Sequence, residues 1–386
     1  MNFATVFSGD RIHPSCHAAT ICEAPDGDLL AAWYAGRAEG SPDSVILGSR
    51  LPKGTATWEP AAVWVNVVSH AAGNPRLFNG PDGALWLLAP INYGRWCQGG
   101  TRLYLKRSYD SGWTWTDLEL FIESKGILGK NKPLYLPPAT WLIPAEFEHA
   151  WQAVFIRLVD QGAHWRLVEP PPTRARLHQP SLVTLSSGTL LAYLRSWEGT
   201  IYQTRSSDQG ASWTKPEPTT LPNNNSGLDL VRLRSGMLLL ACNPVGLGEH
   251  GDQVAQFVGV EPALIPRRRS AAEQRQLENY TELGGEEGNA GYPKWGPRTP
   301  LSLVLSPDEG ATWQHFFDLE SGPGEFSYPA ILQVSDGGVH IVYTWNRRRI
   351  QHVNLAESDF LVPPEVKQST HKVIKSLTLP KPSYSG

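Results

Sequence analysis

Apolar and polar positions follow one pattern that recurs six times along the chain. Each copy is a small polar turn followed by an apolar strand, and β-rich runs such as "PSLVTL" and "PAILQV" precede the turns. The six turn-and-strand segments begin at Ala24, Gly80, Leu136, Ser186, Arg234 and Ser335. A polar turn between two apolar runs of strand length predicts a β-hairpin. We therefore expect six hairpin-based units.

A second string, with the spacing S-x-D-x-G-x-T-W, follows several of these hairpins. It reads "SYDSGWTW" from Ser108, "SSDQGASW" from Ser206 and "SPDEGATW" from Ser306, and "LVDQGAHW" from Leu158 is a worn copy. Asp and Ser or Thr oxygens can accept backbone N–H groups within a tight turn, Gly supplies a conformation that other residues resist, and the Trp ring packs between strands. These aspartates are expected to fold the turns and to do no chemistry.

The two repeats together predict an all-β fold, a six-bladed β-propeller. The sixth unit would take its missing outer strand from the N-terminal "FATVFS", because a strand from the other terminus closes the ring and protects its edges. The fifth unit carries an insertion at about residues 244–298, in which "RRRSAAEQRQLENY" is rich in helix formers; it is either a lid or an elaborated loop. Residues 1–360 would form the propeller and residues 361–386 a loosely ordered C-terminal tail.

Composition narrows the class of protein further. The chain has 36 Gly, 32 Pro and 15 Trp in 386 residues, which favours short strands and tight turns. A net charge of -3 gives no reason to expect nucleic acid or an anionic membrane as partner. No signal peptide is visible, and no apolar run approaches the roughly 20 residues that span a bilayer. The four cysteines form no C-x-x-C pair, which indicates a cytoplasmic protein with reduced thiols and no zinc site. We expect no metal and no cofactor.

The S-x-D-x-G-x-T-W string resembles the Asp-box, or BNR repeat, of the sialidase (neuraminidase) superfamily. The resemblance covers the chain from about Phe3 to His352. It is similar to the bacterial predicted-neuraminidase branch in "HAATICEAPDGDLLAAWYAGRAEGSPD" and "YPAILQVSDGGVHIVYTWNRRRIQHV". The resemblance implies a six-bladed propeller and a glycosidase that hydrolyses carbohydrate, although this fold carries several functions.

The repeat also indicates where a site would lie, because innermost-strand starts and second-strand ends meet around one mouth of a propeller's channel. Counting back from the turns places the innermost-strand starts at His17, Asn74, Asn131 or Lys132, His178 with Gln179, Ser226, and Ser327 with Tyr328. The second-strand ends supply Arg37, Arg95, Arg195, Trp197 and Arg347. The planar fork of Arg suits a carboxylate, so several arginines on one rim would select an anionic sugar.

The resemblance assigns roles to some of these residues. Sialidases hold the substrate's carboxylate with three arginines and use a Tyr nucleophile, a Glu that activates it and an Asp acid/base. Tyr328 would be the nucleophile, Glu325 or Glu198 the activating carboxylate and Asp43 the acid/base. The clamp candidates are Arg37, Arg195 and Arg347.

One position departs from the family pattern. The family's first clamp arginine opens the innermost strand of unit one, where this chain has His17 in "SCHAAT". Arg11 in "DRIHP" lies six residues too early to replace it. The clamp is therefore incomplete or rebuilt.

Three functions stay open. The first is a sialidase-like exo-glycosidase that hydrolyses a terminal acidic sugar, such as sialic acid, from an oligosaccharide or glycoconjugate. The second is a lyase on uronate glycans, with His17 or His178 as base, Tyr328 as acid and Arg37 or Arg195 on the carboxylate. The third is a non-catalytic carbohydrate-binding propeller, which would keep the rim arginines and tryptophans without needing a nucleophile.

Overall fold

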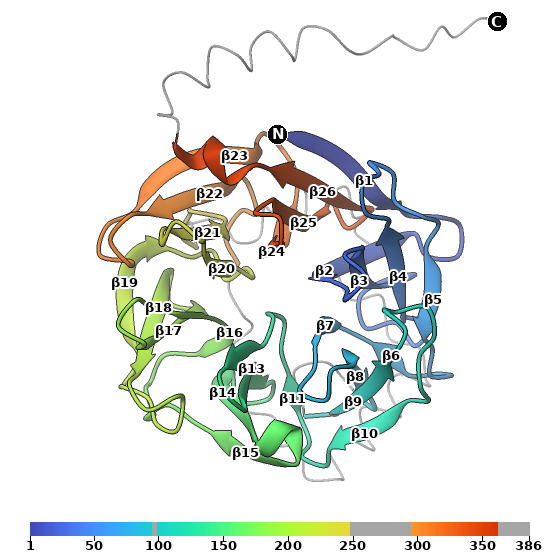
Figure 1. Cartoon of the computed structure of the whole chain (residues 1–386), viewed down its shortest axis with the longest axis horizontal. Coiled ribbons are helices and arrows are strands. Elements are labelled where there is room, and N and C mark those ends of the chain that lie inside the picture. The colour runs from blue at the N-terminus through green and yellow to red at the C-terminus, as the bar shows by residue number, and fades with distance from the viewer. Residues whose placement is uncertain (95–98, 248–294, 362–386) are drawn as a thin grey trace, which may run out of the picture.

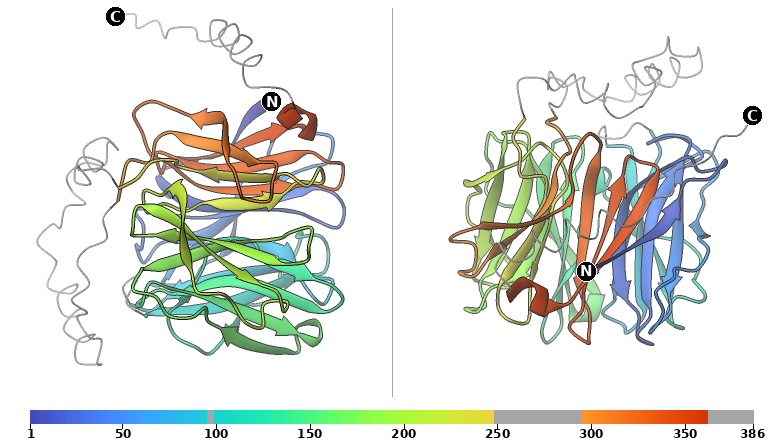
Figure 2. Two further views of the ribbon diagram at one scale, coloured as in Figure 1. Left: turned by 90° about the vertical axis from the view of Figure 1, so that its left-hand side faces the viewer. Right: turned by 90° about the horizontal axis from the view of Figure 1, so that it is seen from above.

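The computed structural model describes residues 1–94, 99–247 and 295–361, and this part of the chain is built almost entirely of β-strands. The sheets are arranged as a ring around a central axis (Figure 1), and their strands run between the two faces of the ring (Figure 2). The predicted insertion and C-terminal tail lie mostly outside the described residues, and Arg95 lies outside them altogether. In the described part, no helix is long and apolar enough to cross a membrane.

The first half of the ring begins with two antiparallel sheets. The first contains β2 (Ser15–Glu23), β3 (Leu29–Gly36), β4 (Val45–Leu51) and β5 (Ala62–Val65). The second contains β6 (Ala71–Ala72), β7 (Arg76–Asn79), β8 (Leu85–Asn92), β9 (Thr101–Ser108) and β10 (Glu119–Ile122).

A nine-stranded sheet follows, and its two halves share one parallel pair, Gln152 with Leu177. One half contains β11 (Ile127–Leu128), β12 (Leu134–Leu136), β13 (Thr140–Phe147), β14 (Gln152–Val159) and β15 (His164–Val168), with the short helix η1 (Asp160–Gly162). The other contains β16 (Leu177–Thr184), β17 (Leu190–Ser196), β18 (Thr200–Ser206) and β19 (Glu217–Pro222).

Two four-stranded sheets complete the ring. One contains β20 (Asp229–Arg232), β21 (Leu238–Cys242), β22 (Leu301–Ser306) and β23 (Gln314–Glu320). The other contains β24 (Phe326–Gln333), β25 (Val339–Trp345), β26 (Arg349–Leu355) and β1 (Asn2–Ser8), and the helix η4 (Glu357–Leu361) follows it. Because β1 pairs antiparallel with β26, with Phe3 opposite Val353, the predicted use of the N-terminal strand in the last sheet is confirmed.

The three well-preserved turn strings share one set of hydrogen bonds. In the third string, the Gly310 amide donates to Ser306 Oγ at 2.8 Å, and Asp308 accepts the Thr312 amide and hydroxyl at 2.8 and 2.6 Å. The strings from Ser108 and Ser206 repeat these bonds. The aspartate oxygens are thus used within their own turns, which follow the ends of β9, β18 and β22.

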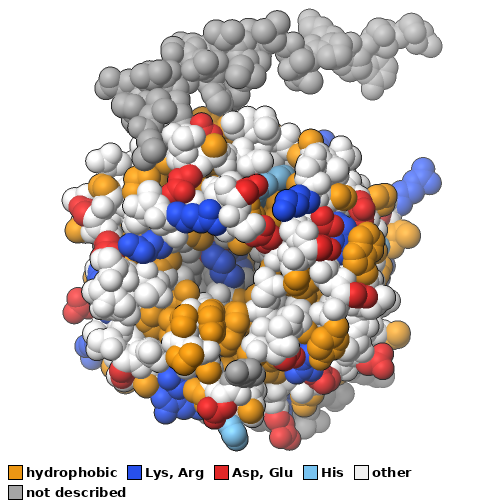
Figure 3. Space-filling view, viewed as in Figure 1, with side chains coloured by type: hydrophobic (Ala, Val, Ile, Leu, Met, Phe, Trp, Pro, Cys, Tyr) orange, Lys and Arg blue, Asp and Glu red, His pale blue; other side chains and the backbone are white. Residues whose placement is uncertain are grey.

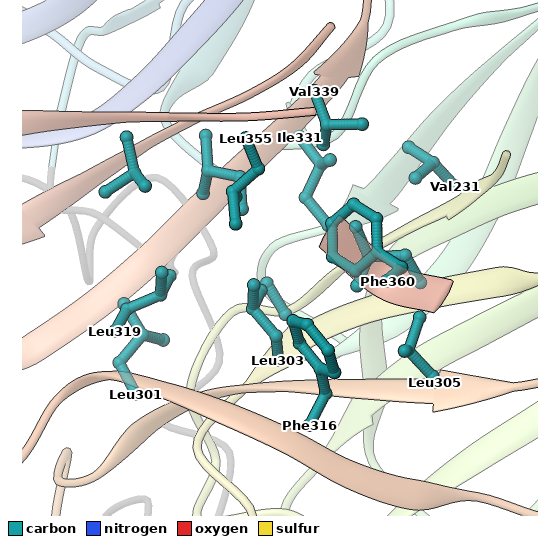
Figure 4. Packing of buried hydrophobic residues seen from close by; sticks show 14 of the residues in the cluster. Val231, Leu301, Leu303, Leu305, Phe316, Leu319, Ile331, Val339, Leu355 and Phe360 are labelled. Atoms are coloured by element: carbon teal, nitrogen blue, oxygen red, sulfur yellow. The ribbon is translucent and has the colours of Figure 1, made fainter. Parts of the chain in front are cut away.

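Apolar side chains fill the space between neighbouring sheets. Figure 4 shows the cluster between the β20–β23 sheet and the β24–β26 sheet, where Leu303, Ile331 and Val353 are almost fully buried. The rings of Phe316 and Phe360 extend this cluster, with centroids 5.0 Å apart. Packing of this kind fixes each sheet against the next, so the residues at the inner strand ends are held on a rigid frame.

Candidate functional site

Three innermost strands carry the same irregularity near their starts. The register of pairing with the next strand shifts between His17 and Thr20, between His178 and Ser181, and between Ser327 and Ala330. Within these bulges Ala18, Gln179 and Tyr328 have positive φ angles of 56°, 46° and 54°. A bulky residue rarely adopts this conformation, and such strain is often found at functional sites. The bulges mark one end of the central axis as the candidate site.

The side chain of Tyr328 contacts residues of the other two bulged strands or of their neighbours. Its oxygen accepts a hydrogen bond from Arg195 Nη1 at 2.6 Å and lies 3.4 Å from Gln179 Nε2. The same Arg195 nitrogen donates to Gln179 Oε1 at 2.9 Å. The His17 ring packs on the Tyr328 ring with centroids 4.2 Å apart. Four predicted site residues from three sheets are therefore in contact, and all four are buried.

A series of hydrogen-bonded polar side chains also holds the Arg195 guanidinium in place. Its Nε donates to Asn225 Oδ1 at 2.9 Å, and that oxygen lies 3.2 Å from His178 Nε2. On the other side of its ring, His178 Nδ1 lies 2.8 Å from Glu146 Oε2. Burial and the Arg195 charge lower the pKa of His178, although Glu146 opposes them. Among the described residues no carboxylate lies within 4.0 Å of the Arg195 guanidinium, which is therefore a buried cation without an ion-pair partner.

Glu325 lies close by, in an ion-pair cluster of its own. Arg298 Nη1 donates to its Oε1 at 2.5 Å, and Arg347 Nε lies 3.0 Å from both carboxylate oxygens. Burial raises the pKa of Glu325, but the two guanidinium groups outweigh burial and lower the pKa to about 2. Arg347 also pairs with Glu39. Arg347, a predicted clamp residue, thus binds two carboxylates of the chain through its Nε and Nη1.

Neither predicted activating carboxylate bonds to Tyr328. The Glu325 oxygens accept from Arg298, Arg347 and Ser327, while the exposed Glu198 accepts the Arg176 amide at 3.2 Å. The described partners of the phenol oxygen are a guanidinium and an amide, which contrasts with the Tyr–Glu pair that the resemblance implies.

Replacing Glu325 with glutamine should lower the free energy of unfolding at pH 7 by about 3–5 kcal/mol, the usual cost of removing one partner from a buried ion pair. Because the folded pKa of about 2 lies below that of an unfolded carboxyl, this stabilisation is complete above the unfolded pKa and is lost as the pH falls toward 2. Urea unfolding at pH 7, 5 and 3 should therefore show a deficit that shrinks only at pH 3. Glu217→Gln, on exposed β19, is the control. An equal deficit at all three pH values would contradict the proposed charge pairing.

His17 presents unused polar atoms to the site. It is almost fully buried between the rings of Tyr34 and Tyr328, and neither of its ring nitrogens has a hydrogen-bond partner among the described residues. Burial, followed by the charges of Arg347 and Arg298, lowers its pKa well below the ordinary value. The imidazole is therefore neutral near pH 7, with one ring nitrogen free to accept a hydrogen bond.

The remaining predicted residues lie around this centre. Arg37 and Asp43 pair with each other at 2.8 Å on the loop between β3 and β4, with 76% of the Arg37 side chain exposed. Trp197 packs on Trp151, with ring centroids 4.5 Å apart. Asn74 is buried just before β7. None of these residues has a described contact with Tyr328.

Two buried cations near Tyr328 were missed by the sequence analysis. Lys130 Nζ lies 5.9 Å and Arg298 Cζ 5.6 Å from the centroid of the Tyr328 ring. Lys130 directly precedes the predicted Asn131, whereas Arg298 was assigned to the end of the insertion. The pattern of innermost-strand starts pointed to the Lys130 segment without selecting this residue. Figure 3 shows that basic side chains also line the hollow on the face it displays.

Comparison with known proteins gives one family and a consistent fold. A model described as the BNR repeat-like domain matches residues 27–341. The Hadza microbial sialidase Hz136 is 17% identical with a TM-score of 0.68, over 93% of this chain and 69% of that one. The intramolecular trans-sialidase from Ruminococcus gnavus is 13% identical with a TM-score of 0.67, over 94% and 99%. The sialidase of Trypanosoma rangeli is 11% identical with a TM-score of 0.64, over 95% and 58%. At these identities the likeness shows the fold, an all-β fold like that of sialidase propellers. The sequence matches none of the curated proteins with which it was compared.

Proposed function

Because the chain belongs to the BNR repeat-like family of the sialidase superfamily, we propose that it is a sialidase-like exo-glycosidase that hydrolyses a terminal acidic sugar from a glycoconjugate. The observation that carries this proposal is the buried Arg195 guanidinium, which has no carboxylate partner among the described residues and donates to the Tyr328 phenol. A buried cation is costly unless it is paired, so the site favours an anionic ligand that completes the pair.

In the proposed reaction the substrate's carboxylate binds Arg195, and Tyr328 Oη attacks the anomeric carbon. The glycosidic C–O bond breaks, its electron pair stays on the leaving oxygen, and Asp43 protonates that oxygen. Water then attacks the anomeric carbon, its proton passes to Asp43, the bond from the sugar to Tyr328 Oη breaks, and the phenol oxygen takes its proton back from the group that accepted it. The neutral His17 imidazole packs on Tyr328 and would accept the phenolic proton once the bound carboxylate raises its lowered pKa by offsetting the charges of the nearby arginines.

Asp43 must change its contacts to act as an acid. Partial burial raises the pKa of Asp43, but hydrogen bonds from Ser41 and Arg37 outweigh burial and lower it. A carboxyl held in this way is ionised near pH 7. Substrate binding would therefore have to draw Arg37 away from Asp43, and the exposure of Arg37 leaves it free to move.

A uronate-glycan lyase is the second candidate, and the free nitrogens of His17 favour it. In that reaction His17 would remove the proton beside the substrate's carboxylate while Arg195 neutralises the carboxylate. The glycosidic C–O bond would then break with formation of a C=C bond, and Tyr328 would protonate the leaving oxygen.

We also infer that the ring has six blades. The nine-stranded sheet is joined through one residue pair only, Gln152 with Leu177, and each of its halves has its own antiparallel meander. Counting the halves separately turns five hydrogen-bonded sheets into six units, which agrees with the number of hairpin repeats in the sequence.

The deciding measurement is the product mass after incubation with a panel of sialylated and uronate-containing oligosaccharides. Products that together gain the mass of one water molecule support the hydrolase. Cleavage without that gain overturns hydrolysis in favour of elimination. Absence of cleavage together with measurable binding would contradict both enzymatic proposals.

A further inference from the structure

Lys130 reaches across the central axis to carbonyl groups of two other sheets. Its Nζ donates to the backbone oxygen of Pro329, the residue that directly follows Tyr328, and lies 3.4 Å from the oxygen of Leu228. The third contact is with the side chain of Asn131, at 2.9 Å. An ammonium group has three N–H donors, so all three have acceptors inside the protein.

Asn131 likewise binds backbone oxygens, in the bulge at the start of β16. Its Nδ2 donates to the backbone oxygens of Gln179 and Pro180 at 3.1 and 2.9 Å. Gln179 is the residue of positive φ that contacts Arg195 and Tyr328. Two adjacent side chains thus bind backbone oxygens at the strained starts of both β16 and β24.

We propose that Lys130, supported by Asn131, is a positioning residue that holds Tyr328 and Gln179 in their reactive arrangement; the catalytic consequence rests on the function proposed above. Backbone at positive φ persists only where surrounding contacts enforce it. A charge-assisted hydrogen bond to the oxygen of Pro329 fixes the peptide next to Tyr328, and with it the direction of the phenol. Lys130 makes no described hydrogen bond to the phenol oxygen; its Nζ lies 5.9 Å from the centroid of the Tyr328 ring, and its hydrogen bond to this strand is with the backbone.

The charge on Lys130 makes this support dependent on pH. Burial, with smaller contributions from Lys132 and Arg195, lowers the pKa of Lys130 to about 7, although Asp229 opposes the shift. The charged and titratable groups around it are Asp229 on β20, Arg195 on β17, Tyr328 on β24, His17 on β2 and Lys132 on its own segment. A neutral amine has only two donors for three acceptors, so deprotonation releases one carbonyl.

The test compares Lys130→Met and Lys130→Arg with the wild type over pH 5.5–9, using the acidic substrate identified by product mass. In the wild type kcat should fall as the pH rises through about 7. In Lys130→Arg, which keeps its charge, this fall in kcat should occur at a pH at least about one unit higher. Lys130→Met should lower kcat by about 10- to 100-fold with little change in KM. Lys106→Met is the matched control, because Lys106 also donates to a backbone oxygen, that of Trp64, on an outer strand.

The proposal is overturned if kcat of Lys130→Arg falls at the same alkaline pH as kcat of the wild type. A second readout needs no turnover and so separates this proposal from the proposed function. In protein labelled with 13C-lysine and 13C-tyrosine, one lysine signal absent from both Lys130 variants should titrate near pH 7, and the Tyr328 ring signal should shift with it. The positioning role is contradicted if the Lys130 signal titrates above pH 9, or if the chemical shift of the Tyr328 ring does not change as Lys130 titrates. Both outcomes can be measured even if the protein has no glycosidase activity.

Discussion

Replacing Tyr328 with phenylalanine should lower kcat on an acidic glycan by at least about 1,000-fold, the scale expected when the group that attacks the substrate is removed. The variant keeps the ring, which packs on His17, and loses one oxygen. Arg195 loses a hydrogen bond but keeps those to Gln179 and Asn225, so the cation that receives the carboxylate stays in place. Substrate affinity, measured by calorimetry, should therefore change by less than about fivefold.

Tyr343→Phe is the matched control for Tyr328→Phe. Tyr343 is a fully buried tyrosine on β25 of the same sheet, and its hydroxyl donates to Glu320 at 2.8 Å. Losing that bond should reduce stability by about 1–3 kcal/mol, because Glu320 loses a donor, without altering kcat of the folded enzyme. If Tyr328→Phe kept more than about a tenth of the wild-type kcat, the phenol could be neither nucleophile nor acid, and both enzymatic proposals would fail.

The strand pattern could be predicted from the sequence because it depends on local periodicity. Each turn sits between two apolar runs, and the string from Ser306 fixes its own hydrogen bonds within seven residues. The pairing of β1 with β26 joins the two ends of the described chain, yet it was also predictable, since the last repeat lacked one strand. What periodicity does not reveal is which neighbouring units share a backbone hydrogen bond, as the Leu177 amide and the Trp151 oxygen do at 2.8 Å.

The site was only partly predictable, because its contacts depend on backbone geometry that residue type does not encode. Counting from the turns located Tyr328, Gln179 and Arg195, which the structure brings together. The positive φ angles of Gln179 and Tyr328 had no signal in the sequence, since neither Gln nor Tyr is a residue that favours them. The resemblance made Glu325 one of two candidates for activating the phenol, whereas the structure pairs it with arginines.

Arg195→Met should lower kcat/KM on an acidic glycan by about 100- to 10,000-fold, in line with the cost of removing one partner of a buried, hydrogen-bonded charge pair. Arg195→Lys should recover little, because a point charge cannot bond Asn225, Gln179 and Tyr328 from one planar group. The loss should fall on both KM and kcat, since the guanidinium would bind the carboxylate and also stabilise negative charge on the phenol oxygen.

A second substrate that lacks the carboxylate charge distinguishes a loss of carboxylate recognition from a general disruption of the site. The wild type should bind the acidic glycan at least about 100-fold more tightly than its methyl ester, whereas Arg195→Met should bind the two about equally. Arg232→Met on β20 removes an exposed arginine whose Nε lies 3.7 Å from Glu309 Oε1, and it should keep the full discrimination. If Arg195→Met still preferred the acid 100-fold, the anion would have to bind elsewhere. Arg298 would then be the next residue to test, because it lies as close to the Tyr328 ring as Arg195 does, at 5.6 Å.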